Sequence, residues 1–480
     1  MEREPFARIH RTPMSELTVK PAVELIGMLQ RGTLSALELA QEHLREIERL
    51  NPLLRAFVDV DPSEVLKAAA EADKLRTRLP QAEDASPLLG LPCSIKSSIS
   101  VAGHLCETGT KLNRGFRPEF DAAAVRLLRQ AGAVILGTTN CPEFLMAYET
   151  DNLLYGATSN PWSLQHQAGG SSGGESAAIA AGLSAGGIGS DSGGSVREPA
   201  HFTGICSLKP TPGRISTEGH TLPCVGPFAT LGALGPMART IADVSLLFES
   251  VSSSKGVKMR TPEEHLRKLP IGVLEDDGHI PVTQETRAAV RAAAQALKER
   301  GFELVPFVSK HLEPARKLWQ DFFIRCGRTL LEPVIQGHED QLSATFNYFL
   351  NFARCQPQIT AAELLATWAE AAQLRETLTH ELAMYTAVIT PVAAIPAFRH
   401  GERRWLIEGR PLEYFDAMRF TQWFNLLGAP AAVVPVGLSS EGLPIGVQVA
   451  SYPHADEIVL AVADLIDKDF GYRPPPMAYC

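Results

Sequence analysis

Two short segments of this 480-residue chain combine serine and glycine in a way that suggests chemistry. Residues 169–174 read GGSSGG, and residues 189–197 read GSDSGGSVR. A serine hydroxyl becomes a nucleophile when a neighbouring base activates it. Glycine lets the backbone approach a reacting carbonyl closely, because no Cβ prevents successive N–H groups from pointing at one spot. The two segments therefore favour a site where backbone groups stabilise a reacting carbonyl.

Other interpretations of the glycine density fit less well. A flexible linker is disfavoured because the Ala-rich residues 176–183, which read as a helix, separate the two segments. A phosphate-binding loop is disfavoured because no Lys-Ser or Lys-Thr follows either segment. Residues 169–173 also match the G-x-S-x-G elbow of α/β-hydrolases, which would make Ser171 the nucleophile. That elbow follows a strand, and residues 160–167 do not read as one.

The sequence around both segments resembles the amidase signature family. Residues 189–200 match that family's pattern G-x-D-x-G-G-S-[IV]-R-x-P-[AS] throughout. Residues 91–96 resemble the family's strand that carries a catalytic lysine, and Lys96, Ser171 and Ser195 are separated by the family's usual intervals of 75 and 24 residues. Four more segments of this chain also resemble family blocks: residues 160–162, 208–214, 235–239 and 442–448.

The resemblance implies a serine hydrolase that cleaves a C–N bond. It assigns Ser195 as the nucleophile that forms an acyl-enzyme, and Ser171, which follows a cis peptide bond, as the proton relay. Lys96 is then the base in its neutral form. A lysine with its usual pKa of about 10.4 is neutral in only roughly 1 in 2,500 molecules at pH 7. We therefore expect burial to lower the pKa of Lys96 by about 2–3 pH units.

The oxyanion site would be formed by backbone N–H groups of the second segment. The residues concerned are Ser192, Gly193, Gly194 and Ser195. All four are small, which fits a close approach of the backbone to the substrate. Asp191 and Arg197 are spaced to bind each other and brace this loop, which we prefer over direct contact with the substrate.

The sequence departs from the family's usual pattern near these residues. Glu175 stands where Ser is common, and Ser192 stands where Thr or Ile is common. Ser97 and Ser98 replace an acidic or Asp-Asn pair that often follows the lysine. None of these changes removes a catalytic group, although Ser97 is expected to alter the surroundings of Lys96.

Three subclasses of the family differ in substrate: the A subunit of tRNA-dependent amidotransferases, fatty acid amide hydrolases, and bacterial amidases for aryl amides, anilides and carbamates, including urethanases. Leu145, Met146 and Tyr148 stand where the family lines the acyl pocket. They make it bulky and apolar, whereas the amidotransferase subunit usually has small residues there. No apolar span precedes residue 15, so an anchor like that of the animal fatty acid amide hydrolase is not expected.

These features predict a free-standing amidase for neutral, apolar amides, anilides or carbamates, with esterase side activity. A fatty acid amide hydrolase and the amidotransferase subunit are the alternatives within the family. An inactive binding subunit is the alternative outside the enzymes, but such a protein would normally lose Lys96, Ser171 or Ser195, and all three are present.

The elements that must position these residues read as an α/β fold. Apolar runs and helical periodicity predict a mixed sheet with helices on both faces. A capping box at Ser35 and Glu38 begins one helix, which we expect to end at Asn51-Pro52. We expect strands at residues 91–95, 134–136, 302–305, 432–438 and 445–450 (the last two as a hairpin), helices at 65–78, 122–130 and 287–300, and a loop at 80–87.

The chain reads as a single domain, 1–480, with three parts. N-terminal helices occupy 14–78, the catalytic signature core occupies 90–250, and a helical, aromatic-rich insertion near the substrate site occupies 309–385. The aromatic residues of the insertion either form its own core or line the pocket, and the sequence leaves both open: Trp319, Phe322, Phe323, Phe346, Tyr348, Phe349 and Phe352.

Composition excludes several other classes of protein. The net charge is −9 and the 45 Lys and Arg residues are dispersed, which argues against a nucleic-acid partner. No apolar run approaches the roughly 20 residues of a membrane span, and the N-terminus lacks the apolar core of a signal peptide. The eight cysteines form no C-x-x-C pair and are expected to be buried thiols, which suits the cytoplasm.

No metal or other cofactor is expected. Four histidines fall near the motifs without metal-binding spacing, and we expect them to be core or solvated residues: His104, His166, His201 and His220. The expected partner is a small-molecule amide, anilide or carbamate, and the sequence leaves a homodimer open.

Overall fold

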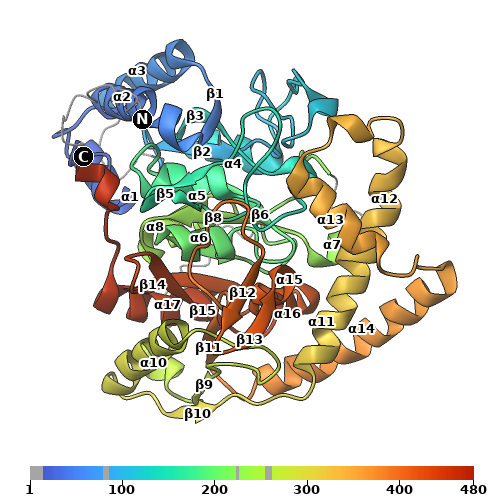
Figure 1. Cartoon of the computed structure of the whole chain (residues 1–480). Coiled ribbons are helices and arrows are strands. Elements are labelled where there is room, and N and C mark those ends of the chain that lie inside the picture. Colours follow the sequence, from blue (N-terminus) through green and yellow to red (C-terminus); the bar gives the residue numbers. More distant parts are fainter. Residues whose placement is uncertain (1–14, 79–85, 223–225, 254–261, 480) are drawn as a thin grey trace, which may run out of the picture.

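The computed structural model describes residues 15–78, 86–222, 226–253 and 262–479. Within these residues, eleven strands form one sheet in the order β1-β3-β2-β6-β8-β7-β14-β15-β11-β9-β10 (Figure 1). The strands are β1 (Phe57–Val60), β2 (Pro92–Lys96), β3 (Val134–Thr139), β6 (Gly186–Asp191), β7 (Cys206–Lys209), β8 (Ala233–Ala238), β9 (Ile271–Val273), β10 (Leu304–Pro306), β11 (Ala387–Pro391), β14 (Ala431–Leu438) and β15 (Pro444–Ala450).

The sheet is mixed, which confirms the predicted fold class. β2 runs parallel to both β3 and β6, and β9 runs parallel to both β10 and β11. The other neighbouring pairs are antiparallel, including the predicted hairpin of β14 and β15. The parallel trio β3-β2-β6 matters most for function, because β2 and β6 both end beside the glycine-serine segments.

Helices cover both faces of the sheet. On β14, Ala432 and Val434 belong to the apolar core that includes α17 (Asp456–Phe470), whereas Val433, between them, packs with Ala200 of α6 (Arg197–Thr203). Because alternate residues of a strand point to opposite faces, α17 and α6 lie on opposite sides. α8 (Ile241–Val251) and α10 (Gln284–Glu299) contact α17, and α5 (Gly173–Ala180) contacts α6. α4 (Ala123–Gln130) contacts α8.

The N-terminal part contains α1 (Ala22–Gln30), α2 (Ala36–Leu54) and α3 (Pro62–Arg78), with the edge strand β1 between the last two. The capping box is present, since Ser35 Oγ accepts the Glu38 N–H at 3.1 Å. The expected helix end at Asn51-Pro52 is wrong. α2 continues to Leu54 and ends at Arg55, which has a φ of 54°. Instead of stopping the helix, Asn51 accepts the N–H groups of Ala56 and Phe57 and directs the chain into β1.

The expectation that residues 160–167 contain no strand is also wrong. β5 (Ser163–Gln167) pairs with β4 (Ser159–Asn160) in a small ribbon outside the main sheet. Leu164 and Gln165 are exposed, so this ribbon needs no run of apolar residues and leaves no apolar signal in the sequence. A second ribbon consists of β12 (Arg404–Ile407) and β13 (Arg410–Glu413).

The predicted insertion consists largely of helices, drawn in yellow to orange along one side of the molecule in Figure 1. They are α11 (Leu312–Gln320), a π-helical turn at Asp321–Arg325, α12 (Cys326–Ile335), α13 (Ala344–Arg354) and α14 (Ala361–Leu382). Residues 312–382 are called the helical insertion below. Its apolar residues belong to a second core cluster, which also takes in Val388, Ala431 and Ala450 of the sheet, and α16 (Arg419–Leu427) packs against the insertion. The remaining short helices are α7 (Pro227–Leu231), α9 (Glu263–Leu266) and α15 (Tyr414–Ala417).

No helix in the described ranges combines the length and apolar character that crossing a membrane requires. Six cysteines lie in these ranges as free thiols, of which Cys355 is exposed and the other five are buried. Cys224 and Cys480 lie outside the described residues, as do the residues 1–14 considered for a signal peptide and most of the loop expected at 80–87.

Candidate active site

Lys96 is the last residue of β2 and lies between its parallel neighbours β3 and β6. Its side chain is fully buried. The Lys96 Nζ donates hydrogen bonds to Ser171 Oγ at 2.6 Å and to Ser190 Oγ at 3.1 Å. Ser171 lies just before α5, after a Gly170–Ser171 peptide bond that is cis. Two residues 75 positions apart are thus brought into direct contact by the ends of neighbouring elements.

Ser195 lies in the loop that joins β6 to α6. Its backbone carbonyl accepts the N–H of Ser172 at 3.1 Å, which fixes the two glycine-serine segments against each other. Ser171 and Ser195, together with Ser190 and Ser192, line one cavity of about 230 Å³. The structure therefore brings Lys96, Ser171 and Ser195 to one place.

Burial lowers the pKa of Lys96 to about 8. The ionised forms of Cys141, Asp191 and Glu175 would work in the opposite direction, but burial outweighs them. A lysine with this pKa is neutral in about half of the molecules at pH 8. The lysine can therefore accept a proton near physiological pH, which an ordinary surface lysine cannot do.

The loop between β6 and α6 offers backbone donors. The N–H of Gly194 donates to Asp191 Oδ1 at 2.8 Å, so this predicted oxyanion donor is engaged. The other three predicted donors, the N–H groups of Ser192, Gly193 and Ser195, make no hydrogen bond within the described part of the chain. Ser192 and Ser195 line the cavity, so their amides can meet a ligand there, whereas Gly193 is not among the lining residues.

Side chains from other elements donate hydrogen bonds to the carbonyl groups of the same loop. The Trp319 indole Nε1 donates to Ser192 O at 2.8 Å. The Tyr148 hydroxyl and Thr421 Oγ1 donate to Gly193 O at 3.0 and 2.6 Å. Glycine at 193 is needed for this packing, because a Cβ there would lie 2.5 Å from the Trp319 ring. Donors from distant elements therefore fix the orientation of the peptide groups.

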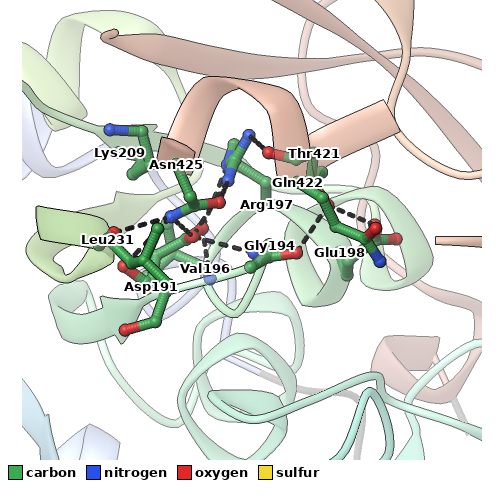
Figure 2. A network of polar contacts seen from close by, with 12 residues as sticks. Asp191, Gly194, Val196, Arg197, Glu198, Lys209, Leu231, Thr421, Gln422 and Asn425 are labelled. Carbon is green, nitrogen blue, oxygen red and sulfur yellow. Dashed lines mark hydrogen bonds and ion pairs between the residues drawn. The ribbon is translucent and has the colours of Figure 1, made fainter. Parts of the chain in front are cut away.

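Asp191 and Arg197, which the sequence predicted to pair, lie at the centre of a buried polar network (Figure 2). Arg197 Nε and Nη2 donate to the Asp191 carboxylate at 3.0 and 2.9 Å, and Asn425 Nδ2 donates to it at 2.9 Å. Burial by itself raises the pKa of Asp191, but Arg197, with help from Asn425 and Lys209, outweighs burial and holds that pKa below its usual range. Arg197 also donates to the carbonyl of Thr421 at 3.0 Å. The network ties the loop to α16.

Apart from its serines, the cavity wall is almost wholly apolar. Two of the three predicted pocket residues, Leu145 and Met146, belong to it. The third, Tyr148, is not among the lining residues and lies behind Gly193 instead. The remaining apolar lining residues come from several elements: Phe144, Leu222, Phe228, Phe323, Leu330, Leu331 and Val334.

The sequence left open whether the aromatic residues of the helical insertion form its core or line the pocket, and the structure shows examples of both. Phe323 lines the cavity, and Trp319 stacks on it with ring centroids 4.8 Å apart. Phe322, Phe346 and Phe349 are fully buried in the insertion core. The other two, Tyr348 and Phe352, pack against Phe415 of α15.

His220 also lines the cavity, which the sequence did not indicate. Burial lowers its pKa to about 4, so the ring is neutral at pH 7. Its Nδ1 lies 3.0 Å from the carbonyl of Leu222 and donates to it, which leaves Nε2 to accept from Ser98 Oγ at 3.2 Å. The other three histidines near the motifs are buried outside this cavity. Among the described residues, no group of three or more His, Cys, Asp or Glu side chains is placed to hold a metal ion.

Several contacts of the site were not indicated by the sequence. Ser190 contacts the lysine, while Trp319, Thr421 and Asn425 hold the loop from more than 100 residues away. Ser190 had a usable signal, since it directly precedes Asp191 on the same strand. The other three come from the helical insertion and α16, where no pattern in the sequence connects them to the loop.

Residues 38–460 match the family model described as Amidase, and the chain belongs to this family. It is 33% identical to the A subunit of a glutamyl-tRNA(Gln) amidotransferase of Roseiflexus castenholzii, over 97% of this chain and 98% of that protein. It is also 33% identical to a putative amidase, AmiB2, of Mycobacterium bovis, over 97% and 99%. The solved structure of a 6-aminohexanoate cyclic dimer hydrolase with its substrate has a TM-score of 0.82 at 26% identity, covering 97% and 100%.

Family, fold and site together define an amidase signature hydrolase, an enzyme of the amidohydrolase type. The two relatives carry different names at the same identity, so the comparisons leave the substrate class open.

Proposed function

We propose that this enzyme hydrolyses neutral, apolar amides, anilides or carbamates through an acyl-enzyme on Ser195, with activity on esters as a side reaction. One observation carries the proposal: a cavity of about 230 Å³ is lined by four serines, among them Ser171 and Ser195, by one neutral histidine and otherwise by apolar side chains. Such a site excludes water from an apolar substrate and presents its carbonyl to a nucleophile.

The first half of the reaction uses the hydrogen bond between Lys96 and Ser171 and the cavity that Ser171 shares with Ser195. As Ser195 Oγ attacks the carbonyl carbon and forms the C–O bond, its proton passes to Ser171, and Ser171 passes a proton to neutral Lys96. The carbonyl oxygen becomes an oxyanion, which the free N–H groups of Ser192, Gly193 and Ser195 stabilise. Because these peptides are already oriented by Trp319, Tyr148 and Thr421, little reorganisation is required.

The second half returns the protons. When the tetrahedral intermediate collapses, the C–N bond breaks, and Ser171 delivers a proton to the leaving nitrogen as Lys96 returns the proton that it took. Water then attacks the acyl group on Ser195 with the same relay as base. An amide gives a carboxylic acid, whereas a carbamate gives a carbonic acid monoester that loses CO₂. An ester substrate follows the same steps with oxygen as the leaving atom.

The cavity wall supports an apolar substrate. Among the described residues that line the cavity, none carries a charge at pH 7, since its histidine is neutral. Burying one large apolar group contributes about 1.5–3 kcal/mol, which corresponds to a factor of about ten or more in affinity. Anilides and aryl carbamates should therefore exceed acetamide in kcat/KM by a factor of about ten or more.

The A subunit of a tRNA-dependent amidotransferase is the second candidate, because the identity to such a protein covers almost the whole chain. That function requires glutamine, whose α-ammonium and α-carboxylate groups need charged or polar partners. The apolar wall at Phe144, Leu145 and Met146 is unfavourable for them. We also propose that the enzyme acts without partner subunits and in the cytoplasm. The five buried free thiols support the second of these points, because a reducing compartment keeps thiols free.

A hydrolysis panel with the purified chain alone tests the proposal. The substrates are glutamine, a medium-chain fatty amide, acetanilide, a nitrophenyl carbamate and a short ester, with Ser195→Ala as the blank. We expect turnover of the anilide and the carbamate and little turnover of glutamine. Efficient glutaminase activity without turnover of aryl amides or carbamates would instead support the amidotransferase alternative. A marked preference for the fatty amide would support a fatty acid amide hydrolase.

A further inference from the structure

Glu175 is a fully buried carboxyl group that the proposed reaction does not use. It lies in the first turn of α5, four residues after Ser171. Its Oε1 accepts a hydrogen bond from Ser94 Oγ at 2.5 Å, and its Oε2 accepts one from Thr139 Oγ1 at 2.7 Å. Two hydroxyl donors on two different strands therefore hold this carboxyl group in one position.

Both donors place the carboxyl group beside Lys96. Ser94 precedes Lys96 by two residues on β2, so the two side chains point to the same face of the sheet. Thr139 of β3 is the direct partner of Lys96 in the parallel pairing. The carboxyl group thus lies on the face of β2 that carries the lysine, and α5 brings it there.

The neighbouring strand leaves room for this carboxyl group. Gly187 on β6 pairs with Ser94, and a Cβ at position 187 would lie only 2.0 Å from Glu175 Oε1. Any other residue at 187 would displace the carboxyl group. Position 175 is also one of the departures from the family's usual pattern, in which serine is common.

The other titratable groups around Lys96 either are paired with an opposite charge or are neutral. Asp191 is paired with Arg197. Burial raises the pKa of the Cys141 thiol and lowers that of His220, so both are uncharged at neutral pH. Within the described ranges, Glu175 has no arginine or lysine in salt-bridge contact, and the thiol next to it, Cys93, has a raised pKa. Of the described groups that act on Lys96, Glu175 is therefore the carboxylate that no arginine balances.

We propose that Glu175 is a positioning residue for the hydrolysis, whose carboxylate favours the protonated form of Lys96 and so raises the pH at which the lysine becomes available as a base. This inference rests on the proposed function, in which Lys96 acts when neutral. Burial raises the pKa of Glu175 to about 7, against the opposing effects of Ser94, Thr139 and Lys96. The carboxylate is thus substantially ionised across the range in which Lys96 loses its proton.

The direction of the effect follows from the charges. A neighbouring carboxylate raises the pKa of a lysine, so removing the negative charge lowers that pKa. Activity that depends on neutral Lys96 would then appear at lower pH. Glu175→Gln keeps the size of the side chain and its ability to bond to the two hydroxyls, while it removes the charge.

The test is the pH dependence of kcat/KM for a neutral substrate, measured for wild type, Glu175→Gln, Glu175→Asp and Asp467→Asn. We expect the midpoint of the alkaline rise to move to lower pH by about half a unit or more in Glu175→Gln. Glu175→Asp retains the charge and should keep a midpoint close to that of wild type, even if its activity is lower at every pH. Asp467 is a second buried carboxyl with a raised pKa, and it is not among the charges that act on Lys96, so Asp467→Asn should not move the midpoint.

A second variant keeps the test decisive if Glu175→Gln does not fold. Ser94→Ala removes one donor from the carboxylate, which raises the pKa of Glu175 and should move the midpoint in the same direction by less. Midpoints of Glu175→Gln and Ser94→Ala equal to that of wild type, with only a uniform loss of activity, would overturn the inference. That outcome leaves the proposed function intact, whereas an active Ser195→Ala variant would overturn the proposed function itself.

Discussion

The loop at residues 189–197 and the helical insertion at 312–382 border the same cavity, but different forces hold them. The loop is fixed by a buried ion pair and by donors to its carboxylate and its carbonyls. The insertion is fixed mainly by aromatic and aliphatic packing, with Phe346 stacked near Phe349 and both fully buried. Polar bonds specify direction, whereas apolar packing specifies mainly volume.

This difference suggests that the loop and the helical insertion have separate roles in the proposed reaction. In that reaction the loop presents N–H groups to a developing charge, which requires peptides that hydrogen bonds already orient. The insertion must only exclude water and match the size of a substrate group, which Phe323, Leu330 and Leu331 can do with looser geometry. Catalytic rate should therefore depend on the loop and selectivity on the insertion. The indole of Trp319 joins the two regions.

The largest expected loss of rate comes from replacing the proposed base, Lys96. Lys96→Arg should be as inactive as Lys96→Ala, with kcat lowered by about 10²–10⁴, because a guanidinium does not give up its proton at these pH values. In wild type, activity should rise with pH through about 8, the pKa of Lys96, since the neutral form is the active one. Steady-state kinetics between about pH 6 and 10 check both points. Substantial activity of the arginine variant would show that Lys96 is not the base.

The next effect should fall on stability. Asp191→Asn leaves the Arg197 guanidinium buried without its counter-ion, which costs about 3–5 kcal/mol of the free energy of unfolding. Asp469 pairs with Arg300 at a partly exposed position, so Asp469→Asn should cost less than about 1 kcal/mol. Urea unfolding followed by circular dichroism measures the difference. Equal effects of the two substitutions would contradict a bracing role for the network.

The contact between the two regions can be broken selectively. Trp319→Phe removes the donor to the Ser192 carbonyl but keeps most of the packing, and an unpaired buried carbonyl costs about 1–3 kcal/mol. We expect kcat to fall by about ten-fold or more with KM little changed. Trp423 is a buried tryptophan whose Nε1 has no hydrogen-bond partner among the described residues, so Trp423→Phe serves as the matched control. A rise in KM alone would place Trp319 in substrate binding.

The smallest expected effect concerns selectivity. Phe323→Ala enlarges the cavity and should lower the preference for an anilide over acetamide by several-fold to about ten-fold, because one aromatic contact is lost. Phe352 belongs to the same insertion but packs on Phe415 away from the cavity, and Phe352→Ala should leave the preference unchanged. Ratios of kcat/KM for the two substrates provide the measurement. Unchanged selectivity in Phe323→Ala would show that the insertion does not contribute to substrate selectivity.

Sequence predicted the parts of the molecule that local rules control. The strand before Lys96, the hairpin at 432–450 and the helix cap at Ser35 follow from apolar patterning and capping chemistry, and the structure confirms them. The predictions failed at Pro52, where the Asn51 side chain binds the backbone five and six residues further along the chain, and at the polar ribbon of β5.

Prediction of the candidate site from the sequence also succeeded for local patterns and failed for contacts between distant segments. The motif predicted which segments meet, because their residue types and spacing are unusual. It did not predict that Tyr148 lies behind Gly193 or that the indole of Trp319 reaches Ser192. Those contacts depend on how the helical insertion packs on the sheet, and many aromatic sequences would pack similarly. Nor did the pattern indicate that Glu175 shares the face of β2 with Lys96, since that follows from the register of three strands and one helix.

The most direct test of the account is to locate the covalent adduct of a fluorophosphonate probe by peptide mass spectrometry. We predict that the probe modifies Ser195 in wild type, that Ser195→Ala is not labelled, and that Ser192→Ala, which alters another serine of the same cavity, is labelled normally. An adduct on Ser171 instead would contradict the account and make Ser171 the nucleophile.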